Sequence, residues 1–285
     1  MDIADELLTE KPIDELVITN KPELGATNEE LAATNKELVT TNRESLWAKI
    51  FRNSHMVVFV SAVIVLTLIY APLTFFVAML FRKLARRMSR GWSSYILGIG
   101  GIQLSVIGKE KIDRKERYVF MSNHQSALDI PIIYTGLGEQ ISFIAKKELF
   151  MIPIFGWGMW AVGHISIDRG NARKAHASIA NAVRKLNKEN VSLILFPEGT
   201  RSKDGKVLDF KTASFTLALQ AGVKLVPVAI KGAIDCLPPK SNRIVPGKVT
   251  LEIGDPIDTT ELQGKSKGEI CSRVHDIIKT MVETN

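Results

Sequence analysis

The residues best suited to chemistry in this sequence are a histidine and an aspartate, His124 and Asp129. They follow the apolar run 118–122, which predicts a buried strand. Catalytic groups in α/β proteins gather just past the carboxyl ends of strands. A histidine there can act as a general base near neutral pH, while an aspartate orients its ring and stabilises the imidazolium that forms. The pair therefore predicts general-base catalysis.

The spacing of this pair limits how it can be held. Five steps along an ideal helix rotate a side chain by about 140°, so the two groups cannot share one helical face. Pro131 disfavours helical geometry at Ile130 and suits the first turn of a helix. We therefore expect His124 in the turn after the strand and Asp129 near the start of the next helix. The simpler alternative is that Asp129 only caps that helix.

A second candidate site is the run Glu198-Gly199-Thr200-Arg201, which follows the apolar stretch 191–196. Its glycine lets the backbone approach a ligand closely, its threonine offers a hydroxyl, and its arginine offers a planar fork suited to phosphate. These residues predict a phosphate site. A surface turn with a solvated arginine is the alternative.

The sequence indicates no other reactive group. No Gly-x-Ser-x-Gly run supplies a serine nucleophile. Cys236 and Cys271 have no metal-ligand spacing and no paired motif, and no His/Cys/Asp cluster has such spacing. We therefore expect no metal and no cofactor. Two isolated cysteines also favour a reducing compartment.

These residues must be positioned by an α/β domain, which we place at residues 91–285. Continuously apolar strands such as 193–196 are typical of a sheet with helices on both faces. The fold class predicted is therefore a single α/β domain with a mainly parallel or mixed sheet flanked by helices. Pro227 within an apolar strand is expected to mark an edge or a bulge. The predicted strands are 102–107, 117–121, 141–145, 164–167, 191–196, 224–230 and 248–253, and the clearest predicted helices are 171–188 and 266–282.

Residues 56–90 predict a hydrophobic membrane anchor with a basic flank. No charge interrupts the 25 residues 56–80, and about 20 apolar residues suffice to span a bilayer. Five basic residues follow between positions 82 and 90, which places the C-terminal body on the cytosolic face of the membrane. Pro72 leaves open a re-entrant pair of helices in one leaflet, and a buried soluble helix is the third reading.

Residues 1–55 read as a polar acidic tail with a heptad-like repeat. Leu24, Leu31 and Leu38 recur every seven residues, which predicts either self-association through a short coiled coil or a solvated, partly helical tail. The whole chain has a net charge of +7. Because the first 48 residues carry a net charge of −7, the remaining residues carry a net charge of +14. That excess indicates an anionic partner. Membrane phospholipid fits better than nucleic acid, because no recognition motif accompanies the charge.

Four ordered blocks give the sequence a family resemblance. The chain resembles the glycerolipid acyltransferases over about residues 92–260, and within them most closely the enzymes that acylate 1-acyl-sn-glycerol 3-phosphate. The blocks are Asn123-His124 with Asp129, Gly163-His164-Ile165-Ser166-Ile167-Asp168-Arg169, Phe196-Pro197-Glu198-Gly199-Thr200-Arg201-Ser202, and Val226-Pro227-Val228.

The resemblance implies roles for these residues. His124 would deprotonate the sn-2 hydroxyl of lysophosphatidic acid, which attacks the thioester of acyl-CoA or acyl-acyl carrier protein as co-substrate. Phosphatidic acid would result, and Asp129 would orient the base. The third block, Glu198 to Arg201, would bind the glycerol phosphate. Lys146, or its neighbour Lys147, would contact the phosphate, and the fourth block would accommodate the acyl chain.

Alternatives stay open at this level. The acceptor could instead be glycerol 3-phosphate, another lysophospholipid or a lipid A precursor, or the chain could be a non-enzymatic membrane-tethered interaction protein. Arg169 could reach the phosphate or pair with a carboxylate, and His164 is expected to be a packed histidine. Ala213 stands where relatives carry glycine after Phe210-Lys211-Thr212, so a need for left-handed backbone there would be unmet.

Overall fold

A computed structural model describes residues 28–138, 140–167, 172–241, 243–262 and 264–284. Two compact units divide the chain at residue 51, and the unit Arg52–Asn285 contains the sheet and every candidate site residue. Leu24 of the predicted heptad tail, together with Asp168 and Arg169, lies outside the described residues.

The centre of this unit is a seven-stranded sheet in the order β1-β7-β6-β2-β5-β3-β4. Every neighbouring pair is parallel except β6 and β7, so the sheet is mixed, as predicted. All seven predicted strands are present with small shifts at their ends. Their bounds are Ile102–Ile107 (β1), Val119–Ser122 (β2), Ile141–Lys146 (β3), Ile165–Ile167 (β4), Ser192–Leu195 (β5), Leu225–Lys231 (β6) and Gly247–Ile253 (β7).

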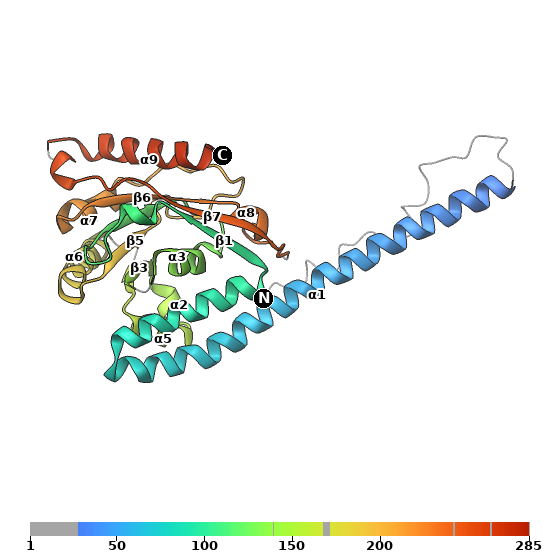
Figure 1. Cartoon of the computed structure of the whole chain (residues 1–285), viewed down its shortest axis with the longest axis horizontal. Helices are drawn as coiled ribbons and strands as arrows, with labels where there is room; N and C mark the ends of the chain where they lie inside the picture. The colour runs from blue at the N-terminus through green and yellow to red at the C-terminus, as the bar shows by residue number, and fades with distance from the viewer. Residues whose placement is uncertain (1–27, 139, 168–171, 242, 263, 285) are drawn as a thin grey trace. The chain divides into compact units, whose positions relative to one another are not determined.

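Helices cover both faces of the sheet, and Figure 1 shows the strands between α9 on one side and α2 and α3 on the other. Two apolar clusters fill the two interfaces. One packs α2 and α3 against the sheet, and the other packs α6, α7 and α9. The helices are α2 (Arg82–Ile99), α3 (Asp129–Leu137), α4 (Lys147–Phe150), α5 (Phe155–Val162), α6 (Ala172–Glu189), α7 (Ala213–Ala221), α8 (Ala233–Cys236) and α9 (Lys267–Glu283), with 3-10 turns η2 (Lys109–Lys111) and η3 (Thr259–Leu262).

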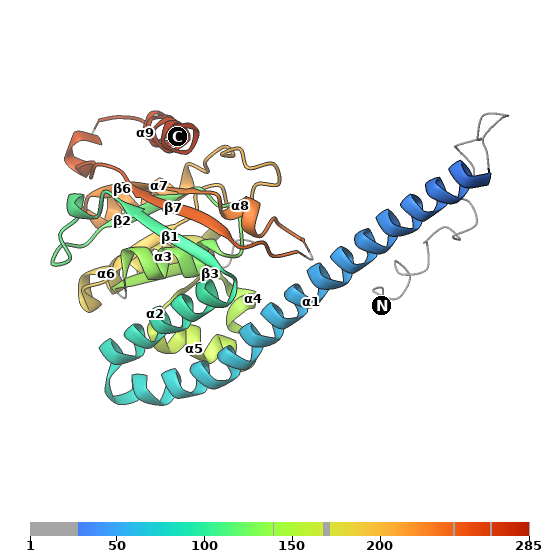
Figure 2. The same cartoon turned by 45° about the vertical axis from the view of Figure 1, so that its right-hand side comes forward.

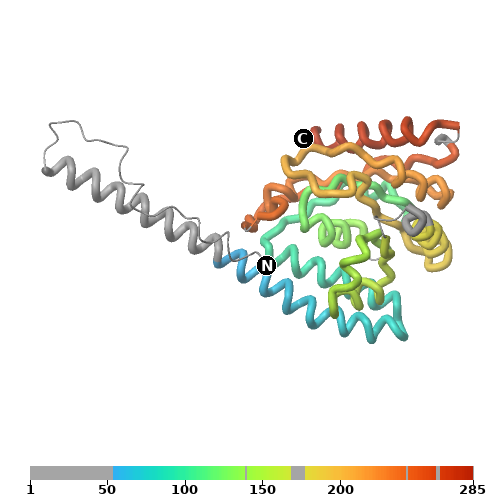
Figure 3. The backbone as a smooth tube through the Cα atoms, turned by 180° about the vertical axis from the view of Figure 1, so that it is seen from behind, coloured from blue at the N-terminus to red at the C-terminus, as the bar shows by residue number. Residues whose placement is uncertain are grey.

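The predicted anchor is part of a helical hairpin. Helix α1 (Asn28–Leu80) stops at Phe81, and α2 returns beside its C-terminal half, as Figures 2 and 3 show from two sides. The indole N–H of Trp92 on α2 donates to the hydroxyl of Thr67 at 3.2 Å, and Tyr70 meets Tyr95 edge to face. These contacts join the two helices of the hairpin, and Ile96 and Leu97 of α2 pack into the apolar cluster between α3 and the sheet.

The other side of α1 carries apolar side chains that the protein does not cover. Residues 54–80 form one helix that is long and apolar enough to cross a membrane, with a mean hydropathy of 2.5, and only 11% of its most apolar stretch is buried. The basic flank is partly occupied within the protein. Arg82 and Arg86 on α2 both form salt bridges with Glu189 at the end of α6.

Pro227 corrects one expectation, because it lies in an interior strand. Strand β6 is flanked by β2 and β7, and Pro227 is in register with Met121 of β2. The antiparallel ladder between β6 and β7 starts only at Val228, so the missing N–H of proline falls where β7 has ended. The carbonyl of Pro227 is still used, since it accepts from the N–H of Gly254 at 2.8 Å.

Asn123 ties the turn after β2 to the neighbouring strand β6. Its buried side-chain amide donates to the carbonyl of Ile230 at 2.9 Å and accepts from the N–H of Ile230 at 2.8 Å. The Asn123 side chain thus takes the place of the two backbone groups that a neighbouring strand would offer to Ile230. It also fixes the backbone next to His124.

We predict that Asn123→Ala lowers the free energy of unfolding by about 2 to 4 kcal/mol, because it leaves two buried backbone groups of Ile230 without partners. Thermal unfolding of the detergent-solubilised protein measures the change. Gln103→Ala, on an exposed position of β1, is the control and should shift stability by less than about 0.5 kcal/mol. Equal effects of the two substitutions would refute this role.

Candidate active site

His124 and Asp129 form a hydrogen-bonded pair at the carboxyl end of β2. His124 lies in the turn that follows the strand, and Asp129 is the first residue of α3, as expected from their spacing. The imidazole Nδ1 is 2.6 Å from Oδ2 of the carboxylate. Because a carboxylate accepts, Nδ1 carries the proton and Nε2 is left as the basic nitrogen.

The carboxylate of Asp129 does not cap α3. It is fully buried, and its Oδ2 also accepts from the backbone N–H groups of Gln125 at 2.8 Å and Ser126 at 2.9 Å. These donors precede the helix, whose N-cap position is held by Leu128. The same oxygen therefore fixes both the turn and the ring of His124, which is the arrangement an orienting partner requires.

Phe196 fixes the plane of the imidazole. Its ring stacks on that of His124 with centroids 4.1 Å apart and an interplanar angle of 19°. The two residues follow the carboxyl ends of neighbouring parallel strands, β2 and β5, so the contact follows from the sheet order. The backbone of His124 is held as well, because its carbonyl accepts from the N–H of Ser202 at 2.8 Å. Sequence reasoning named Phe196 only as the first residue of the third block and did not predict this contact.

Glu198 is a buried carboxyl group behind the pair, 3% exposed. Its Oε1 accepts from the N–H of His124 at 2.8 Å, and its Oε2 accepts from the N–H of Leu208 at 3.3 Å. Burial raises the pKa of Glu198 to about 7; the two backbone donors oppose this shift, and the nearby charge of Asp129 adds to it. The side chain thus lies against the backbone of the catalytic turn and is absent from the lining of the cavity described next.

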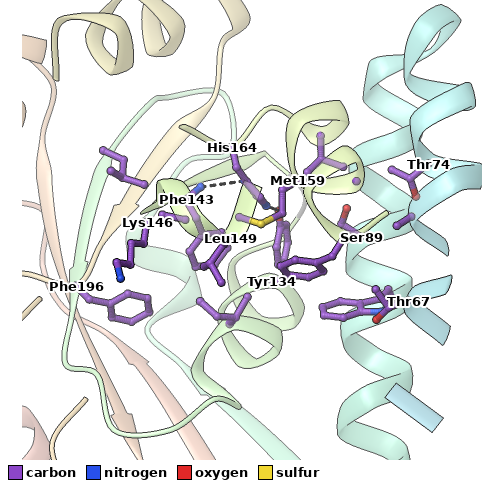
Figure 4. A pocket seen from close by; sticks show the side chains of 18 of the residues that line it. Thr67, Thr74, Ser89, Tyr134, Phe143, Lys146, Leu149, Met159, His164 and Phe196 are labelled. Atoms are coloured by element: carbon purple, nitrogen blue, oxygen red, sulfur yellow. Dashed lines mark hydrogen bonds between the residues drawn. The ribbon is translucent and has the colours of Figure 1, made fainter. Parts of the chain in front are cut away.

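A cavity of about 420 Å³ opens from this turn. His124, Lys146, Thr200 and Arg201 line it, and Figure 4 shows Lys146 and Phe196 at one end with the α1 side at the other. This volume lies within the range of small-molecule sites. Most of the wall is apolar, and its members include Ala71, Trp92, Ile130, Phe143, Ile144, Leu149, Phe155, Met159 and Val162.

Small residues let the helices of the cavity approach closely. A Cβ added at Gly158 on α5 would lie 2.9 Å from the Cβ of Ala71 on α1. Two tryptophans of α5, Trp157 and Trp160, also contact Phe75 of α1 with ring centroids 6.3 and 6.1 Å apart. The anchor helix therefore forms one wall of the cavity.

His164 is a packed histidine, as expected. Its Nδ1 accepts from the N–H of Phe143 at 3.2 Å, and its Nε2 lies 2.7 Å from the hydroxyl of Tyr134. Burial lowers the pKa of His164 to about 3, and the positive charges of Lys185 and Arg86 act in the same direction. The neutral ring supports the aromatic wall of the cavity in Figure 4.

Of the two neighbouring lysines that were candidates for phosphate binding, Lys146 lines the cavity and Lys147 does not. Nζ of Lys146 also lies 3.7 Å from the carboxylate of Glu148. Ala213 begins α7 without positive φ, so no left-handed residue is needed there. Among the described residues, no group of three or more His, Cys, Asp or Glu side chains could hold a metal ion.

Comparisons with known proteins agree with this architecture. The family model described as "Acyltransferase" matches residues 103–231. A 1-acyl-sn-glycerol-3-phosphate acyltransferase of Haemophilus influenzae is 34% identical over 172 residues, 60% of this chain and 71% of that protein. The Escherichia coli protein of the same name is 32% identical over 58% of this chain and 66% of its own length.

A solved structure extends the match to the fold. The crystal structure of the 1-acyl-sn-glycerophosphate (LPA) acyltransferase, PlsC, from Thermotoga maritima superposes with a TM-score of 0.71 at 31% sequence identity. The alignment covers 82% of this chain and 96% of that one. Fold, site and matches together define an enzyme that transfers acyl groups. The chain belongs to the acyltransferase family that includes these relatives.

The raised pKa of Glu198 predicts a pH dependence of stability. Between pH 4.5 and about 7 the unfolded chain has lost this proton while the folded protein still holds it. Stability should therefore fall as the pH rises through this window, by up to about 3 kcal/mol, and stay level above it. Glu198→Gln removes this titration.

Thermal unfolding of the wild type and Glu198→Gln between pH 5 and 8 measures the effect. The stability of the wild type relative to the variant should decline up to about pH 7. Glu110→Gln, at an exposed position, should leave the pH dependence of the wild type unchanged. Parallel curves for the wild type and Glu198→Gln would show that Glu198 is not protonated in this range.

Proposed function

We propose that the protein transfers a fatty acyl group from acyl-CoA or acyl-acyl carrier protein to the sn-2 hydroxyl of 1-acyl-sn-glycerol 3-phosphate. The product would be phosphatidic acid, and the reaction would be a step of phospholipid biosynthesis. The observation that carries the proposal is the His124–Asp129 pair at 2.6 Å, at the end of an apolar cavity that also holds two cations, Lys146 and Arg201. The names of the matched relatives support the choice of acceptor.

The chemistry follows from the proton positions. Nδ1 of His124 donates to Asp129, so Nε2 takes the proton of the acceptor hydroxyl as its oxygen attacks the thioester carbonyl carbon. The carbon–sulfur bond then breaks, and the carrier thiolate takes the proton from the imidazolium. Asp129 stabilises the imidazolium between these two steps, so His124 and Asp129 are the catalytic residues.

Substrate binding divides along the cavity. Gly199, Thr200 and Arg201 would bind the glycerol phosphate together with Lys146, because all four line the cavity that His124 also lines. The apolar wall would take the acyl chain, whose burial is favourable at roughly 25 cal/mol per Å². Glu198 would support this end indirectly by holding the backbone of His124.

The anchor would place the site at the surface of the membrane that contains the acceptor. The uncovered apolar side of α1 suits the lipid interior, and juxtamembrane basic residues add about 1 kcal/mol each near anionic lipid. Arg82 and Arg86 are paired with Glu189, so the exposed Lys83 is the better candidate for that contact among these three residues. Their position favours the cytosolic face for the catalytic domain.

An acceptor panel tests the function. Membranes containing the full chain are given acyl-CoA with lysophosphatidic acid, glycerol 3-phosphate, other lysophospholipids or a lipid A precursor, and the products are identified by lipid mass spectrometry. We expect phosphatidic acid as the main product. Preferential acylation of another acceptor would replace the proposed substrate while leaving the reaction class in place.

His124→Ala should lower kcat by at least about 10²-fold to 10⁴-fold, because it removes the general base. His55→Ala, on α1 and away from the cavity lining, is the control and should keep wild-type turnover. A folded His124→Ala protein with normal activity would exclude this mechanism.

Arg201→Ala should raise the KM for lysophosphatidic acid about tenfold with little change in kcat, because a charge-assisted hydrogen bond to phosphate is lost. Steady-state kinetics with varied acceptor provides the measurement. Arg114→Ala, an exposed arginine before the amino end of β2, is the matched control. An unchanged KM in Arg201→Ala would place phosphate binding elsewhere.

A further inference from the structure

The side chain of Lys211 lies across Gly199. A Cβ added at Gly199 would be 2.8 Å from Nζ of Lys211, 3.1 Å from its Cε and 3.3 Å from its Cδ. Real Cβ atoms are not found this close to other heavy atoms, so any side chain at position 199 displaces the lysine. Gly199 also has a φ of 73°, which glycine adopts without strain. Both features make room for the ammonium group at this turn.

The backbone of Lys211 is held in place from two directions. Its N–H donates to the carbonyl of Pro197 at 2.9 Å, which ties it to the turn that carries Gly199. Its carbonyl accepts from the N–H of Ser214 at 3.0 Å, in the first turn of α7. The backbone of the lysine is thus tied to the third block, although Lys211 comes nine residues after Ser202, the last residue of that block.

The ammonium group is available for a ligand. Lys211 is exposed, and no carboxylate within the described part of the chain forms a salt bridge with it. Lys211 is not among the residues that line the cavity, but Gly199, over which it lies, lines the cavity together with Thr200 and Arg201. The ammonium group therefore adds a third positive charge at the edge of the cavity, after those of Lys146 and Arg201. Phosphate dianions are bound by such groups of cations.

We propose that Lys211 is a further binding residue for the phosphate group of a substrate, placed over Gly199 so that it acts together with Arg201. This inference rests on the proposed acyl transfer to a phosphate-bearing acceptor. Arg201 offers a planar fork, whereas Lys211 offers a compact charge with three donors, so the two can approach different oxygens of one phosphate. The phosphate belongs either to the acceptor or to the CoA part of the donor.

Steady-state kinetics of Lys211→Met, Lys211→Arg and Lys203→Met distinguish these sources. Methionine keeps the length and apolar stem of lysine without its charge, and Lys203 is an exposed lysine of the same loop. We expect Lys211→Met to raise the KM for lysophosphatidic acid about tenfold, with kcat and the KM for acyl-CoA nearly unchanged. Lys211→Arg should restore most of the affinity, and Lys203→Met should behave as the wild type.

Other results have defined meanings. A rise only in the KM for acyl-CoA assigns Lys211 to a phosphate of the donor. Unchanged KM values for both substrates in Lys211→Met overturn the proposal.

Binding without turnover separates this inference from the proposed function. In the His124→Ala protein, inorganic phosphate should raise the melting temperature, and adding Lys211→Met should abolish most of that shift. If the wild type acylates no phosphate-bearing acceptor, the proposed function fails, yet this measurement still tests Lys211. An equal shift with and without Lys211 would reject the lysine whatever the reaction.

Discussion

One buried oxygen atom holds the site together. Oδ2 of Asp129 receives the imidazole Nδ1 and two backbone N–H groups, all from the three residues 124–126. The other carboxylate oxygen is buried with no hydrogen-bond partner among the described residues, so the negative charge depends on this single set of donors. A buried charge is stable only with such partners. Because the same oxygen accepts from the imidazole and from the backbone of the turn, a change in the conformation of the turn also changes the orientation of the His124 ring.

The sheet order turns this local arrangement into a complete site. Strands β2 and β5 are neighbours, so the turn after β2 meets the run 196–201 after β5. The ring of Phe196 then stacks on the imidazole, and the carboxyl group of Glu198 accepts a hydrogen bond from the backbone N–H of His124. On the opposite side of β2, Asn123 binds both backbone groups of Ile230 in β6. The turn that carries His124 is thus supported from both neighbouring strands, as the proposed role of a general base requires.

Local patterns predicted the helices and strands well, and they also predicted where His124 and Asp129 lie. Apolar runs predicted all seven strands, and Pro131 placed Asp129 at a helix start. The failures concern contacts between distant segments. Pro227 was expected at an edge or a bulge, but an interior strand accepts it because β7 ends beside it. The local sequence around Pro227 does not show where β7 ends. The stack of Phe196 on His124, the role of Glu198 behind the turn and the contact of Lys211 with Gly199 likewise depend on strand order and loop packing.

The close approach of Gly158 to Ala71 joins α5 to the anchor helix and makes that helix a wall of the cavity. A form of the protein without residues 54–80 would therefore lose one wall of the cavity. It would open the cavity to water and remove Phe75 from the half-exposed Trp157 and Trp160, which enlarges the uncovered apolar face and favours aggregation. Protein engineering for solubility has to replace the outer side of α1 and leave its inner side intact.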